Sequence, residues 1–235
     1  MNPRAVLLPG SLLPSRLLGR DQPRKPAQSV HADYTLGHPG RPAPVPTLLI
    51  TLFDNSGSVT SAGGTDPLSN RYAEAERAFA VVARRGSRHE LGAIIHFDTP
   101  SSGEVEPTAI TRSGLVRLRT GLRPPPEAAG TSELRPSLHR AVELAETHAD
   151  HEVTLVVLSD FLFMDPEPAP VLSDLATFPG TVHAIVLGRR LPEGVLDERI
   201  TVTSVDRDCP PGAVARALFI GLVAHRPGSQ VQGGT

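Results

Sequence analysis

The chain has 235 residues, 39% of them hydrophobic, and a net charge of -2, which suits one large domain or a domain with a tail. No run of about 18 apolar residues occurs, which argues against a membrane-spanning helix, and aromatic residues at 4% with no Trp leave few candidates for stacking on bases. The only cysteine, Cys209, excludes an intramolecular disulfide and favours a reducing, cytoplasmic compartment.

Residues 1–46 form an expected Pro-rich, basic leader. Its prolines recur throughout and exclude a regular helix or a central strand. Six basic residues stand against two acidic ones, so this segment carries +4 and the rest of the chain carries -6. We do not expect a secretory signal, because prolines interrupt the apolar stretches and arginines follow them closely.

Leucine pairs at five-residue spacing stand out in this leader. A disordered linker is usually poorer in large apolar residues. The pairs could instead dock in extended form on this chain or on a partner. The sequence leaves both interpretations open for the residues concerned, which are Leu7, Leu8, Leu12, Leu13, Leu17 and Leu18.

Beyond the leader, strands and helices are expected to alternate. Short apolar runs predict strands, and apolar stripes at helical spacing predict helices. Asp66 followed by Pro67 predicts the start of one helix, whose apolar stripe begins at Leu68. Pro107 marks one strand as an edge strand. The expected strands cover residues 47–53, 91–97, 104–111, 153–158, 181–187 and 200–205.

This alternation predicts an α/β fold. We expect a doubly wound, mostly parallel sheet of Rossmann-like type with helices on both faces and one antiparallel edge strand. The domain is expected to span residues 47–226, and residues 227–235 are expected to form a flexible tail.

Hydroxyl and carboxylate side chains follow two of the expected strands. Asp54, Ser56 and Ser58 come directly after the first strand in the pattern D-x-S-x-S, and Asp160 ends the strand at 153–158. Thr131 lies in a loop that opens the expected helix at 134–145. Such oxygen ligands suit a hard divalent cation, and open α/β sheets bind ligands at the carboxyl ends of their strands. The alternative is that Ser56 and Ser58 only cap a helix or a turn.

Together these residues resemble the von Willebrand factor A (vWA) domain and its metal-ion-dependent adhesion site. The resemblance covers roughly residues 46–226 and departs at Asp160-Phe161, where the family often has Asp-Gly. It implies Mg2+, Mn2+ or Ca2+ with Ser56 and Ser58 as direct ligands and Thr131 as a direct or water-mediated one. Asp54 and Asp160 would act largely through water, and a carboxylate of a partner protein would fill the open position.

The resemblance also implies a biological setting. Intracellular bacterial relatives often work beside AAA+ ATPases of the MoxR type, or in multi-gene stress and defence systems. The bias for Arg over Lys, together with the Ala, Pro and Gly content, is typical of a high-GC bacterial genome. We therefore expect a bacterial, cytoplasmic, metal-dependent protein-binding module.

Two alternatives to an adhesive module stay open. One is a scaffold whose metal only orders the loops around it. The other is a metal-dependent phosphohydrolase with Asp54 as nucleophile. Against the enzyme, Ser56 stands where such enzymes commonly place a second Asp, and no Lys follows Asp160, because Lys25 is the only lysine. We expect no enzymatic activity.

Overall fold

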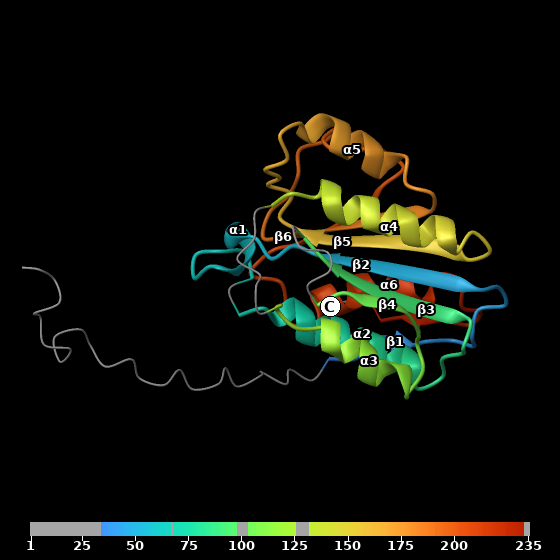
Figure 1. Ribbon diagram of the computed structural model, residues 1–235. Coiled ribbons are helices and arrows are strands. Elements are labelled where there is room, and N and C mark those ends of the chain that lie inside the picture. Colours follow the sequence, from blue (N-terminus) through green and yellow to red (C-terminus); the bar gives the residue numbers. More distant parts are fainter. Residues whose placement is uncertain (1–33, 67, 98–102, 126–131, 233–235) are drawn as a thin grey trace, which may run out of the picture. The chain divides into compact units, whose positions relative to one another are not determined.

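A six-stranded sheet forms the centre of the structure, with strand order β4-β3-β2-β5-β6-β7 (Figure 1). Neighbouring strands are parallel, except that β3 and β4 are antiparallel. This arrangement confirms the expected α/β fold with one antiparallel edge strand. The strands are β2 Thr47–Phe53, β3 Glu90–His96, β4 Val105–Ala109, β5 Glu152–Ser159, β6 Thr181–Leu187 and β7 Thr201–Val205.

The structure is a computed structural model that describes residues 34–66, 68–97, 103–125 and 132–232. All of these belong to one compact unit, which spans Ala32–Thr235. The leucine pairs of the leader and Thr131 lie outside the described residues. None of the described helices combines the length and the apolar character that crossing a bilayer requires.

Helices cover both faces of the sheet, as Figure 1 shows for α4 above it and for α2 and α3 below it. Side chains of strand β2 pack against the helices on both faces of the sheet, because successive side chains of a strand point to opposite faces. Leu49 and Phe53 pack with α2, α3 and α6, whereas Leu48 and Ile50 pack with α4 and α5. The helices are α1 Gly57–Thr60, α2 Asn70–Ala83, α3 Gly114–Gly121, α4 Arg135–Thr147, α5 Pro168–Ala176 and α6 Ala213–Val223.

The start of α2 differs from the sequence-based expectation. The helix begins at Asn70, and Ser69 just before it adopts the left-handed conformation with φ 54°. Asp66 still caps the helix, since its carboxylate accepts hydrogen bonds from the backbone N–H groups of Asn70 at 2.9 Å and Arg71 at 3.3 Å. Leu68, expected on the buried stripe, is 66% exposed because the helix starts after it.

The compact unit also extends beyond the expected limits of 47–226. Strand β1 (Gly37–His38) pairs with β8 (Gln230–Val231), so segments assigned to the leader and to the tail form a small antiparallel sheet. Arg226 is buried and donates to Glu90 at 2.6 Å and to the carbonyl of Pro39 at 2.6 Å. Sequence patterns did not predict the contact between these two ends of the domain, because each segment is short and rich in Pro and Gly.

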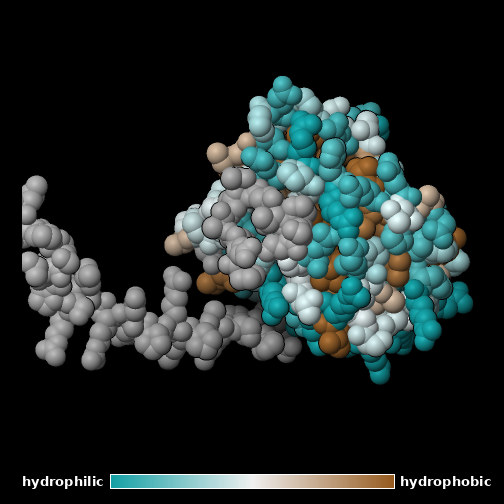
Figure 2. All heavy atoms as spheres, in the orientation of Figure 1, coloured by the Kyte–Doolittle hydropathy of each residue, from teal (hydrophilic) through white to brown (hydrophobic). Residues whose placement is uncertain are grey.

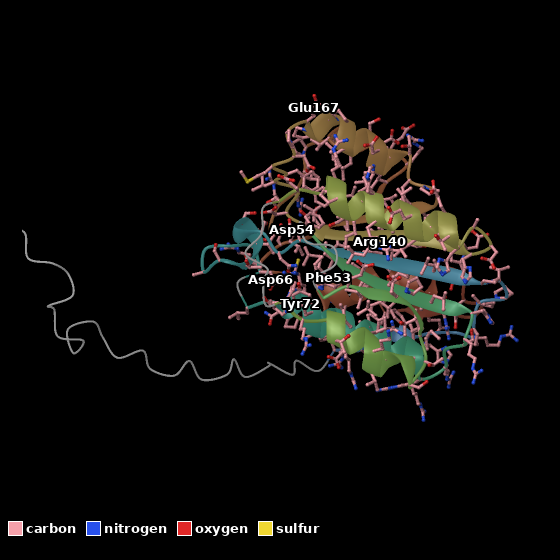
Figure 3. All side chains as sticks on the ribbon, in the orientation of Figure 1. Phe53, Asp54, Asp66, Tyr72, Arg140 and Glu167 are labelled. Atoms are coloured by element: carbon pink, nitrogen blue, oxygen red, sulfur yellow. The ribbon has the colours of Figure 1, made fainter. Side chains whose placement is uncertain are left out.

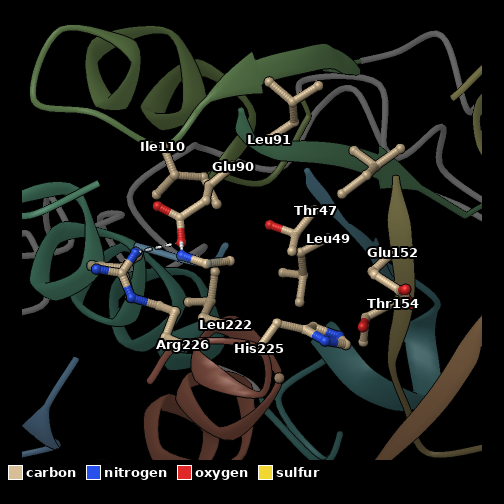
Figure 4. Close-up of a pocket in the computed structure, with 14 residues that line it drawn as sticks. Thr47, Leu49, Glu90, Leu91, Ile110, Glu152, Thr154, Leu222, His225 and Arg226 are labelled. Atoms are coloured by element: carbon tan, nitrogen blue, oxygen red, sulfur yellow. Dashed lines mark hydrogen bonds and ion pairs between the residues drawn. The ribbon is translucent and has the colours of Figure 1, made fainter. Parts of the chain in front are cut away.

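The ion pair between Arg226 and Glu90 borders a small pocket at the amino ends of the parallel strands (Figure 4). Thr47, Glu152 and His225 also line it. Loops that follow a parallel strand lie at the opposite edge of the sheet, where the residues of the D-x-S-x-S motif are found.

Candidate metal centre at the carboxyl ends of β2 and β5

Asp54 and Asp160 follow two strands that lie side by side. Phe53 of β2 is in register with Leu158 of β5, so both chains leave the sheet at the same level. The backbone N–H of Asp54 donates to the carbonyl of Leu158 at 3.0 Å, which extends the ladder by one bond. Asp54 lies at the end of the sheet from which α1 extends (Figure 3), and both aspartates are fully buried.

The Asp54 carboxylate is held at both oxygens. Oδ1 accepts the backbone N–H of Ser56 at 2.8 Å, and Oδ2 accepts the hydroxyl of Ser159 at 2.6 Å. Burial raises the pKa of Asp54 above its usual range; the charge of Asp160 adds to the rise, and the hydrogen bonds from Ser159 and Ser56 oppose it. A nearby cation would remove this penalty by compensating the two carboxylates.

Ser56 and Ser58 present two hydroxyl groups to each other. Their Oγ atoms are 3.0 Å apart, with Ser56 buried and Ser58 half-buried. Ser56 occupies the N-cap position of α1, yet its side chain makes no capping hydrogen bond. The Ser56 side chain therefore does not cap this helix, and its hydroxyl instead lies within hydrogen-bond distance of that of Ser58.

Asp160 has one satisfied oxygen and one unsatisfied oxygen. Oδ1 accepts the backbone N–H of Leu162 at 3.1 Å. Oδ2 is buried and has no hydrogen-bond partner among the described residues. Buried carboxylate oxygens are normally paired, because leaving one unpaired costs at least about 1–3 kcal/mol. An unpaired oxygen at this edge of the sheet is what a bound cation or its water would satisfy.

Phe161 follows this aspartate in a backbone conformation that favours glycine. Its φ of 57° lies in the left-handed region, which glycine adopts without strain. A non-glycine residue there costs about 1–2 kcal/mol. The Phe161 ring packs 5.2 Å from that of Phe163 and against the apolar cluster on the α4 face, and this packing offsets the strain.

Two buried side chains outside the sequence-based prediction support the candidate ligands. Ser159 orients Asp54, as described above. Asp165 accepts the backbone N–H groups of Leu134 at 2.9 Å and Arg135 at 3.0 Å at the start of α4. Asp165 therefore ties the loop after Asp160 to the segment that follows Thr131. The apolar run that precedes Ser159 marked the end of a strand, but no local pattern pointed to Asp165.

A buried polar network lies beneath the loop that carries the motif. The Arg71 guanidinium donates to the carbonyl of Asp54 at 2.9 Å, to Asn55 Oδ1 at 2.9 Å and to Asp66 at 2.7 Å. The Tyr72 hydroxyl also donates to Asn55 Oδ1. This network fixes the loop backbone from α2, at a position that hydrophobic periodicity does not reveal.

His96 closes the same network on the side of β3. Asn55 Nδ2 donates to His96 Nδ1 at 3.0 Å, so Nε2 carries the proton and donates to the carbonyl of Gly121 at 3.0 Å. Burial lowers the pKa of His96 to about 4, which keeps the ring neutral. Both ring nitrogens of His96 thus make hydrogen bonds within this network, which gives the ring a structural role.

The donor set fits a hard divalent cation. Two carboxylates and two hydroxyls follow β2 and β5 at the same edge of the sheet, and all offer oxygen atoms to a cation. Among the residues that the structure describes, no group of three His, Cys, Asp or Glu side chains could hold a metal ion. A cation site here would therefore depend on serine and threonine hydroxyls as well as on the two aspartates.

No protein-family model and no curated protein matches the sequence. Solved structures match the fold at low sequence identity. The pilus adhesin SpaC from Lactobacillus rhamnosus GG matches at 13% identity with a TM-score of 0.58, over 78% of this chain and 31% of the adhesin chain. The SpRpn10 VWA domain matches at 10% identity with a TM-score of 0.52, over 74% of this chain and 94% of that domain.

Proximal thread matrix protein 1 from the mussel byssus matches at 13% identity with a TM-score of 0.50, over 77% of this chain and 48% of that chain. The chain thus spans about a third of the adhesin and about half of the matrix protein, but nearly all of the VWA domain. These similarities show that the fold is that of a VWA domain.

Proposed function

We propose that this chain is a vWA-type module that binds a partner protein through a divalent cation. Asp54, Ser56, Ser58, Thr131 and Asp160 would hold the cation. The buried Oδ2 of Asp160, which has no partner among the described residues, carries the proposal. The charge of Asp160 acts on the Asp54 carboxylate, and the paired hydroxyls of Ser56 and Ser58 lie on the loop that follows Asp54. SpaC, which shares the fold, is a pilus adhesin, in line with a binding role for the fold.

The ligand chemistry favours adhesion over cation storage. Serine and threonine hydroxyls are neutral ligands, so two aspartates are the only charges offered to a divalent ion. Both oxygens of Asp54 already accept hydrogen bonds, which favours contact through water for that residue. Bound Mg2+, Mn2+ or Ca2+ would supply residual positive charge that attracts a carboxylate of the partner.

The partner and setting follow from the sequence arguments. We propose a bacterial, cytoplasmic protein whose partner supplies an Asp or Glu, within an assembly that contains an AAA+ ATPase. A scaffold whose metal only orders the loops is the second candidate, favoured by the extensive polar network under the motif. We propose that the protein has no enzymatic activity, and hydrolysis of p-nitrophenyl phosphate in Mg2+ would contradict this.

Calorimetry with MnCl2 on the full chain tests the site. Asp160→Asn should weaken Mn2+ binding at least about tenfold, or about 1.4 kcal/mol, since it removes one of two charged ligands. Asp150→Asn is the matched control, because Asp150 is exposed and precedes β5 at the opposite edge of the sheet. Equal Mn2+ affinity in both variants would refute the site.

A chelator separates the two candidate functions once a partner is known. An adhesive module loses its partner in EDTA, and the loss is reversed by Mn2+. A scaffold that binds through other surfaces keeps its partner in EDTA, although its melting temperature falls.

A further inference from the structure

The loop after Asp160 exposes two large apolar side chains. Leu162 is 48% exposed and Met164 is 70% exposed, which makes Met164 the most exposed large hydrophobic residue in the described part of the chain. Figure 2 shows that most of the described surface in this view is hydrophilic, with small, separate apolar areas. Single exposed apolar residues are common on proteins. These two differ because they lie within four residues of a candidate metal ligand.

The backbone of this loop is held in place on both sides of the exposed residues. The N–H of Phe161 donates to Ser159 Oγ at 2.8 Å and the N–H of Leu162 donates to Asp160 Oδ1 at 3.1 Å. The N–H of Met164 donates to the carbonyl of Ser132 at 3.1 Å, and Asp165 caps α4 with both carboxylate oxygens. Leu162 and Met164 are thus presented on a fixed backbone.

Side chains alternate along the loop between the core and the solvent. Phe161 and Phe163 turn inward, where the Phe163 ring lies 5.2 Å from Phe161 and 6.2 Å from Phe97. Leu162 and Met164 turn outward. The two phenylalanines anchor the loop to the fold, so the outward pair contributes little to the core and remains available for contact.

We propose that Leu162 and Met164 form an apolar contact surface for the partner segment that supplies the carboxylate. The inference rests on the proposed function of the site. The hydrogen bond of Leu162 to Asp160 places one side chain beside one candidate ligand, and that of Met164 to Ser132 places the other beside the segment that leads into α4. A partner carboxylate bound beside Asp160 would have its neighbouring residues over Leu162 and Met164.

The chemistry of the partner segment follows. It carries an Asp or Glu with a Leu, Ile, Met or Phe within about four residues, the span of one helical turn. Specificity then has two sources. The carboxylate recognises the cation, and the apolar neighbour removes Leu162 and Met164 from water, which stabilises the complex in proportion to the apolar area buried. Methionine at such a surface adapts to apolar side chains of different shapes.

Selection from a phage library of random linear peptides tests the inference on the full chain in MnCl2. Wild-type protein should enrich peptides with an acidic residue beside a large apolar one. The double variant Leu162→Ser/Met164→Ser should keep the acidic preference and lose the apolar one. Peptides selected on wild type should bind each single variant about tenfold more weakly.

A matched control uses exposed apolar residues elsewhere. Val116 on α3 is 65% exposed and Ile220 on α6 is 46% exposed, close to the values for Met164 and Leu162. The variant Val116→Ser/Ile220→Ser should select the same peptides as wild type.

The outcomes separate this inference from the proposed function. Acidic peptides without apolar neighbours, or the same apolar preference in all three proteins, would overturn the inference and leave the metal site standing. No acidic preference in Mn2+ would overturn both. Binding of wild type to phosphatidylcholine vesicles in EDTA, lost in Leu162→Ser/Met164→Ser, would assign the pair to a lipid surface and overturn the inference.

Discussion

Removing the buried guanidinium of Arg71 should destabilise the domain severely. The Arg71 side chain is 0% exposed and its Asp66 partner is 12% exposed, with 2.7 Å between the charged atoms. Arg71→Met keeps much of the side-chain length but leaves Asp66 without its counter-charge. It also leaves the carbonyl of Asp54 without the Arg71 donor, and takes one of two donors from Asn55 Oδ1.

The expected loss follows from burial. Breaking a buried ion pair by removing one partner costs about 3–5 kcal/mol, because a charge is left uncompensated in the interior. The two lost hydrogen bonds belong to the same network, so their energies do not simply add to this figure. Arg71 Nε is buried without a partner among the described residues, and its removal recovers part of the cost. We therefore expect a loss of about 3–5 kcal/mol in the free energy of unfolding.

Urea denaturation followed by circular dichroism measures this loss. With a denaturant slope of about 2 kcal/mol per molar, the midpoint should fall by about 2 M. The control is Arg119→Met. Arg119 pairs with Glu76 at 2.8 Å, nearly the same distance, but the two side chains are 50% and 39% exposed. Exposed pairs are worth about 0–1 kcal/mol, so this midpoint should move by less than about 0.5 M.

The comparison isolates burial, since both variants remove an arginine from a short ion pair. Equal midpoint shifts in Arg71→Met and Arg119→Met would refute the reasoning that the interior amplifies the loss of Arg71. An Arg71→Met midpoint within about 0.5 M of wild type would refute the network as a support of the loop.

Three further predictions concern pH, the cation and the leader. The pKa of His96 is about 4 in the folded protein, against a reference value of 6.5, so between these values the unfolded chain binds a proton that the folded chain does not. Lowering the pH from about 7 to about 4 should therefore remove about 3 kcal/mol of stability. In urea denaturation at the two pH values, His96→Gln should lack this pH-dependent loss. Mn2+ at a hundred times its dissociation constant should stabilise the wild type by about 2.7 kcal/mol in thermal melts and should leave Asp54→Asn unchanged; an equal gain in both would speak against Asp54 as part of the site. Asparagine is preferred to alanine there, because Asp54 is buried and accepts two hydrogen bonds that alanine would abolish. Replacing the leucine pairs of the leader by serine should weaken domain stability or partner binding. Stability and binding equal to those of the wild type would favour the linker interpretation. The residues are Leu7, Leu8, Leu12, Leu13, Leu17 and Leu18.

The sequence predicted the main sheet and its helices well, because buried apolar residues recur at the spacing of a strand or of a helix. Apolar runs located the six strands of the main sheet, and Pro107 marked β4 as an edge strand. The expectation failed where short elements depend on distant partners. Strands β1 and β8 have two residues each and pair across nearly the whole domain, so neither has a pattern of its own.

The places of the candidate ligands relative to the strands were predictable for a related reason. Asp54, Ser56 and Ser58 directly follow β2, and Asp160 directly follows β5. The carboxyl ends of parallel strands lie at one edge of the sheet, so the sequence alone determined which oxygen-bearing side chains follow these strands and at which edge, while the metal site itself stays a prediction.

Only the tertiary structure decided how those ligands are held. Ser159 bonds to Asp54 across 105 residues of chain, Asp165 caps α4 across 31 residues, and Arg71 reaches Asp54 across 17 residues. A buried polar group must find a partner, but the partner is set by proximity in the folded chain and by no local repeat. For the same reason the sequence could not show that one oxygen of Asp160 lacks a partner among the described residues, or that Leu162 and Met164, which follow it, face the solvent.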